Sequence, residues 1–137
     1  MKRVIAPVLV IVGLVGIALA GYWFKQQADA RPVACIDPVA GCHFEHAGTP
    51  VQLRFSRRPV PLKAFQLDIH SVAADRISAE FQMQGMEMGF NRYDLSPTPG
   101  SAFTAQVTLP VCVSGRHDWT MFLTIDGTRY AVPFSTH

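Results

Sequence analysis

The sequence lacks the features that would place it among nucleic-acid-binding proteins or common enzymes. Its formal net charge is only +2 over 137 residues. No basic stripe interleaved with aromatic residues is present, so attraction to a phosphate backbone would be weak. There is no Gly-x-Ser-x-Gly elbow, no His-Glu-x-x-His and no glycine-rich phosphate loop. The cysteines also lack the Cys-x-x-Cys spacing of thiol oxidoreductases. We therefore expect a protein that is not an enzyme and does not bind nucleic acid.

Charge is also missing from residues 4–24, an apolar run of about 20 residues preceded by Lys2 and Arg3. Such a run can cross roughly 30 Å of hydrocarbon as a helix. We predict a membrane anchor over residues 1–25, with the basic residues cytoplasmic and the aromatic residues 22–24 at the far interface. The alternative is a signal peptide, because small-x-small cleavage sites end at residues 20 and 30. Both interpretations export the rest of the chain.

Beyond a polar linker at residues 26–34, apolar and polar residues alternate with a period of two. This pattern is typical of strands that bury one face. The turn signal Asp126-Gly127 predicts a two-residue hairpin between the last two alternating segments. We therefore predict an all-β, immunoglobulin-like antiparallel sandwich over residues 35–137. The alternating segments are residues 51–56, 65–70, 77–83, 103–109, 119–125 and 130–134.

Export changes the interpretation of the three cysteines, because an oxidising compartment permits disulfides. An odd count leaves at least one cysteine over. We expect a Cys35–Cys42 disulfide, since the turn "IDPVAG" between them closes a short loop at little entropic cost. The alternative is Cys42 with Cys112, which would join the first strand to a late one.

The stretch "MQGMEMGFNRY" (residues 83–93) holds three of the five methionines. Met83 is in phase with the apolar stripe before it, so we assign it to the core. Gly85 can host a bulge that resets the phase. Met86 and Met88 then point to the same side of a strand. Thioether sulfur is soft and uncharged, so this pair predicts a Cu(I) site.

Two further side chains are candidate ligands beside the methionine pair. Cys112 could supply a thiolate, and His117 an imidazole. His43 and His46 fall on opposite sides of a strand, which argues against joint ligation. The competing interpretation is that methionine only fills gaps in a core, as it commonly does.

Two stretches, "MEMGFNRYDL" and "GSAFTAQVTLPVCVSGRHDW", resemble a family of small bacterial inner-membrane proteins with one N-terminal helix and a periplasmic β domain. The shared pattern is similar to Met-x-Met-Gly-x-Asn-Arg-x-x-Leu, then a strand, then Leu-Pro-Val-Cys and a basic-acidic-Trp turn. The paired cysteines and "RRPVPLKAFQLDI" also resemble that family. The resemblance covers most of residues 35–137.

This resemblance implies a role linked to copper or to oxidase assembly. Such proteins are often found near Sco-type copper chaperones, and more distantly they resemble the periplasmic domains of FixH and YtkA proteins. Family members often carry methionine where this chain has His117, an exchange that keeps a metal-ligand type. The first hypothesis is a single-pass inner-membrane protein whose periplasmic domain binds or delivers Cu(I), with a Sco-type chaperone or an oxidase subunit as partner. The second is a non-metal subunit that docks on a membrane complex through "NRYDL".

Overall fold

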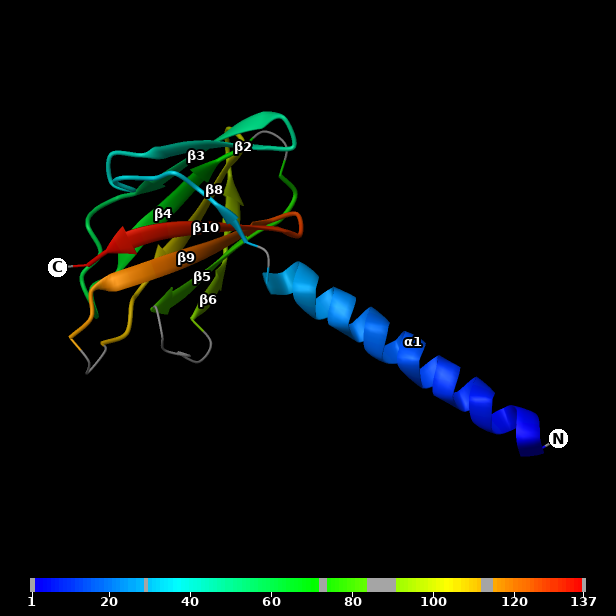
Figure 1. Cartoon of the computed structure of the whole chain (residues 1–137). Helices are drawn as coiled ribbons and strands as arrows, with labels where there is room; N and C mark the ends of the chain where they lie inside the picture. Colours follow the sequence, from blue (N-terminus) through cyan, green and yellow to red (C-terminus); the bar gives the residue numbers. More distant parts are fainter. Residues whose placement is uncertain (1, 29, 72–73, 84–90, 112–114, 137) are drawn as a thin grey trace. The chain divides into compact units, whose positions relative to one another are not determined.

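The computed structural model describes residues 2–28, 30–71, 74–83, 91–111 and 115–136, which divide into two compact units at residues 30 and 31 (Figure 1). The first unit is a single helix, α1 (Lys2–Ala28), whose side chains are described for residues 8–22. Among the residues that the structure describes, no helix is long and apolar enough to cross a membrane. The membrane anchor stays a prediction.

The second unit consists of two five-stranded sheets. Sheet A has the strand order β1-β10-β9-β5-β6, and sheet B has the order β2-β3-β4-β8-β7 (Figure 1). All neighbouring strands are antiparallel except β1 and β10, which are parallel. The strands are β1 (Arg31–Pro32), β2 (Cys42–His46), β3 (Thr49–Phe55), β4 (Phe65–His70), β5 (Ile77–Met83), β6 (Arg92–Asp94), β7 (Ser96–Thr98), β8 (Ala102–Val107), β9 (Asp118–Ile125) and β10 (Thr128–Ser135).

Each alternating segment of the sequence forms one of the longer strands, β3, β4, β5, β8, β9 or β10. The predicted strand over residues 103–109 extends two residues beyond the end of β8 at Val107. The carbonyl of Leu109 instead accepts a hydrogen bond from the Leu62 N–H at 2.9 Å. Strands β1, β6 and β7 were missed, because two or three residues are too few to show a period of two.

The two sheets enclose a common apolar core, as a sandwich-like fold requires. Aromatic rings connect the layers. Phe65 of sheet B lies 6.2 Å from Phe81 of sheet A, and Phe55 of sheet B lies 5.4 Å from Phe134 of sheet A, both edge to face. These four side chains have exposed fractions of 7% or less. The predicted two-layer β architecture is therefore present.

The predicted hairpin turn lies between β9 and β10, where Ile125 pairs with Thr128. Asp126 and Gly127 both have positive φ, 46° and 88°, as a type I′ turn requires. The Asp126 carboxylate accepts a hydrogen bond from the Arg76 N–H at 2.8 Å and another from the Asp75 N–H. These bonds, the one from Arg76 first, hold the pKa of Asp126 below its ordinary value of 3.8.

A lowered carboxyl pKa makes a testable contribution to stability. The stabilisation is fully present above the unfolded-state pKa, and it is lost as pH falls from about 5 through that value towards the folded-state pKa. We expect Asp126→Asn to lack this part of the acid dependence, since an amide does not ionise in this range. Urea midpoints at several pH values between 6 and 3 measure it, with the exposed Glu45→Gln as the control. Parallel curves for Asp126→Asn and wild type would contradict the assignment.

Candidate functional site

A cleft of about 560 Å³ opens at one end of the sandwich. Strand β3 ends there at Phe55, β10 ends there at Ser135, and β9 begins there at Asp118. Its walls come from these strand ends of both sheets, from the chain segment 35–39 and from residues 58–59. We call this end of the domain the cleft end.

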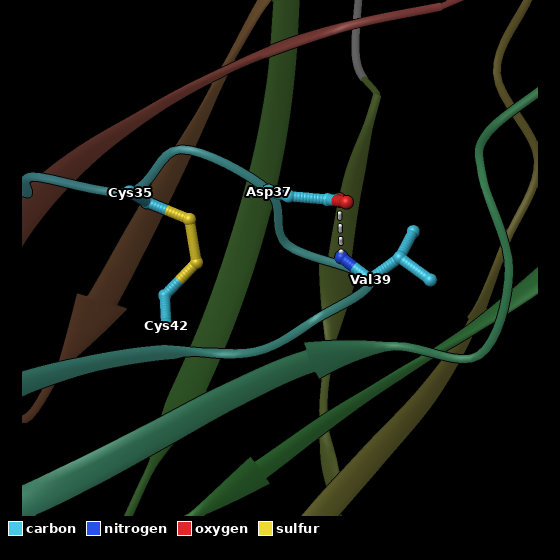
Figure 2. The surroundings of a disulfide bond; sticks show 4 residues. All are labelled: Cys35, Asp37, Val39 and Cys42. Atoms are coloured by element: carbon cyan, nitrogen blue, oxygen red, sulfur yellow. Dashed lines mark hydrogen bonds between the residues drawn. A yellow bond between two sulfur atoms is a disulfide. The ribbon is translucent and has the colours of Figure 1, made fainter.

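The wall at residues 35–42 is a loop closed by a disulfide between Cys35 and Cys42, whose Cα atoms are 5.4 Å apart (Figure 2). The predicted pairing is present, so the alternative between Cys42 and Cys112 is excluded. Of the three cysteines in the chain, Cys112 is the one outside this bond.

Local chemistry shapes this loop. The Asp37 side chain accepts a hydrogen bond from the Val39 N–H at 2.9 Å, a turn that aspartate commonly makes two residues ahead (Figure 2). Gly41 has a φ of 106°, a conformation that side chains with a Cβ rarely adopt. The Phe55 N–H donates to the carbonyl of Pro38 at 2.9 Å. These contacts hold the loop against the end of β3.

The disulfide should make a measurable contribution to stability. Closing a loop of this length in the unfolded chain is worth about 2–3 kcal/mol in the chain-entropy description. We expect Cys35→Ala/Cys42→Ala to lower the free energy of unfolding in urea by that amount. Wild type measured under a reductant is the matched control and should agree with the double variant. A loss below about 1 kcal/mol would contradict the assignment, because native disulfides in small domains typically contribute more.

Charged side chains line the cleft on both sides. Arg58 and Asp37 both line the cleft and lie 4.0 Å apart, and Asp118 of the opposite wall lies 3.6 Å from Arg116. The side chains of both pairs are 42–57% exposed, so each pair adds little to stability. The cleft therefore presents both signs of charge to solvent.

Three of the four residues predicted to bind copper, Met86, Met88 and Cys112, lie outside the described residues. The fourth, His117, is exposed just before β9, and its carbonyl accepts a hydrogen bond from the Thr136 N–H at 2.9 Å. Within the described part of the chain, no group of three or more His, Cys, Asp or Glu side chains is arranged to hold a metal ion.

The strand register relates the two segments that carry the predicted ligands. Strand β5 ends at Met83, which pairs with Trp119 near the start of β9. Trp119 in turn pairs with Phe134 of β10, and both line the cleft. The last residue of β5, which precedes the segment with Met86 and Met88, therefore pairs with the second residue of β9, which follows His117. Met83 itself is 3% exposed, so its predicted place in the core is confirmed.

Trp119 carries a polar atom that is not satisfied within the described residues. Its ring is 2% exposed and stacks on Phe134 at a centroid distance of 6.4 Å. Its indole nitrogen is buried without a hydrogen-bond partner in the part of the chain that the structure describes. Buried tryptophan N–H groups normally find an acceptor. The cleft end thus contains a buried donor that has no acceptor among the described residues.

Comparison with protein-family models and with curated proteins finds no match to this chain. The resemblance to the inner-membrane family therefore stays a hypothesis.

Proposed function

We propose that the protein is a membrane-anchored, periplasmic copper-binding or copper-delivery accessory protein with an immunoglobulin-type exported domain. Met86 and Met88 bind Cu(I), and Cys112 or His117 completes the ligand set. The observation that supports this most directly is the pairing of Met83 with Trp119. The segment that carries Met86 and Met88 follows β5, the segment that carries Cys112 and His117 precedes β9, and these two strands are neighbours.

The chemistry of the donors suits this role. Thioether and thiolate sulfur prefer Cu(I) among the common biological metals. The disulfide occupies Cys35 and Cys42, so Cys112 is the cysteine that can supply a thiolate. Exchange by ligand swapping needs an exposed, under-coordinated ion, which thioethers at an end of the sandwich would provide. A Sco-type chaperone or an oxidase subunit in the inner membrane would be the exchange partner.

The direct test is a Cu(I) titration of the full-length chain against a competing chelator, with free thiols counted beforehand. We expect one thiol per chain without reductant and one Cu(I) bound per chain. A chain with its thiol intact that leaves all Cu(I) on a weak chelator would refute the proposal.

A second candidate is a non-metal subunit that docks on a membrane complex. It is favoured by three large apolar side chains that are exposed on loops of the sandwich. Ile36 is 105% exposed, Leu62 70% and Val111 57%. Ile36 lines the cleft, and the Leu62 N–H donates to the carbonyl of Leu109, two residues before Val111. This candidate is supported if Cu(I) does not bind and substitution of Ile36 by Ser abolishes capture by a membrane complex.

The surface that the sequence suggested for such docking, "NRYDL", is largely structural. The Tyr93 hydroxyl donates to the carbonyl of Thr108 at 2.9 Å, and Leu95 is 7% exposed. Only Arg92 and Asp94, which lie 3.7 Å apart, project as exposed charges. A partner would therefore contact this stretch through an ion pair.

A further inference from the structure

Two histidines that are far apart in the sequence lie in one row across sheet B. His43 of β2 pairs with Gln52 of β3, and Gln52 pairs with His70 of β4. All three side chains are exposed, while the residues beside them in each strand, such as Leu53 and Ile69, point into the core. The row therefore lies on the outer face of the sheet, away from the cleft.

Both imidazoles line the same hollow, which has a volume of about 250 Å³. Gln52 lies between them on the central strand, but its side chain extends along the sheet towards Gly41. Its Nε2 is 3.9 Å from the position that a Cβ on Gly41 would occupy. The Gln52 side chain thus reaches towards Gly41, two residues before His43, and the hollow is bordered by His43, Gln52 and His70.

The wall of the hollow beside His70 is formed by Ser71 and Ser101. Ser71 follows β4 directly, lines the hollow and is only 4% exposed. Its backbone N–H donates to the carbonyl of Ser101 at 3.0 Å, which holds the turn in place. Its Oγ has no hydrogen-bond partner among the residues that the structure describes. Because this oxygen is buried from solvent, it is not a candidate ligand for an ion in the hollow.

The spacing suits a shared metal ion. Two strands of a sheet that are separated by a third lie about 10 Å apart. Two imidazoles that lean across the central strand can each place a nitrogen about 2.0–2.1 Å from one ion. Imidazole is a preferred ligand of Zn(II), Ni(II) and Cu(II), and affinity in this series is highest for Cu(II).

We propose that His43 and His70 form a surface site for a divalent transition-metal ion, with Cu(II) bound most tightly. Water fills the remaining positions. The Gln52 amide oxygen can supply a third ligand by rotation of its side chain. This site does not rest on the proposed Cu(I) function, because it uses different residues, a different donor type and a different oxidation state.

The test is titration of the full-length oxidised chain with Cu(II), followed by electron paramagnetic resonance and calorimetry. We expect nitrogen hyperfine coupling from imidazole in wild type. His43→Gln and His70→Gln should each weaken Cu(II) binding at least about 10-fold, because loss of even an outer partner of a metal site weakens metal affinity about 10- to 100-fold. Both side chains are exposed, so urea unfolding should be unchanged and should exclude misfolding.

Two matched controls separate this site from the proposed Cu(I) site. His117→Gln removes another exposed imidazole, and Met86→Leu/Met88→Leu removes the thioethers. Neither change should alter Cu(II) binding at His43 and His70. Unchanged Cu(II) affinity in both His43→Gln and His70→Gln, or an absence of nitrogen coupling in wild type, would overturn the inference whatever the Cu(I) result.

Discussion

Cu(I) should bind the Met86→Leu/Met88→Leu chain at least about 100-fold more weakly than it binds wild type. Loss of one outer partner of a metal site commonly weakens metal affinity about 10- to 100-fold, and this variant loses two direct ligands. Leucine keeps the apolar volume of methionine but has no sulfur lone pair. The substitution therefore removes two thioether donors and keeps the side-chain volume. Competition against a Cu(I) chelator, with the full-length chain and its thiol intact, measures the change.

The chain offers a matched control for this experiment. Met83 and Met121 are also methionines, but they are 3% and 0% exposed in the core. Met83→Leu/Met121→Leu also removes two sulfur atoms, but from buried positions, and such volume-conserving exchanges usually cost less than about 1.5 kcal/mol in stability. Its Cu(I) affinity should equal that of wild type. Equal losses in the two double variants, or no loss in either, would refute binding by the Met86 and Met88 pair.

The largest effect on stability is expected from Phe81→Ala, a loss of about 3–5 kcal/mol in the free energy of unfolding. Phe81 is fully buried on β5. Its ring lies within 6.2 Å, centroid to centroid, of the rings of Phe65, Tyr93 and Phe134, which come from both sheets. Removing it deletes apolar burial and leaves a cavity that rigid strands cannot fill. Urea denaturation at low temperature measures the loss.

Phe122→Ala provides the comparison for this prediction. Phe122 lies on the neighbouring strand β9 but on its outer face, where the Arg129 guanidinium sits 4.1 Å above its ring. Both side chains are half-buried, and a contact of this kind is worth about 0.5–2 kcal/mol, less than the loss expected for Phe81→Ala. If the two substitutions destabilised the domain equally, the assignment of inner and outer faces would be wrong.

The sequence predicted the long strands because each of them buries one face and exposes the other, and that difference appears directly as alternation. Strand β2 shows where this signal fails. Its inward positions include a histidine, His46, which is 7% exposed and shares a 2.9 Å hydrogen bond with the Tyr130 hydroxyl. A polar residue that finds a partner inside the core breaks the apolar pattern without breaking the strand.

The candidate site was only partly accessible to sequence reasoning. The Cys35–Cys42 disulfide could be predicted, because a short loop with a proline and a glycine closes on itself through local forces. The cleft could not, since its walls join that loop to Asp118 and Ser135 from the other end of the chain. Segments so distant in sequence meet only because β9 and β10 pair and pack against the opposite sheet.

Local properties of the chain were therefore determined by the sequence alone: which segments alternate, where the Asp126-Gly127 turn falls, and that His43 and His46 face opposite ways. Tertiary structure decided which distant residues become neighbours. His43 and His70 enter one row only through the register of β2, β3 and β4. That register is set by the turns and by burial of one face of every strand, because a slip of one residue would turn the whole apolar set outward.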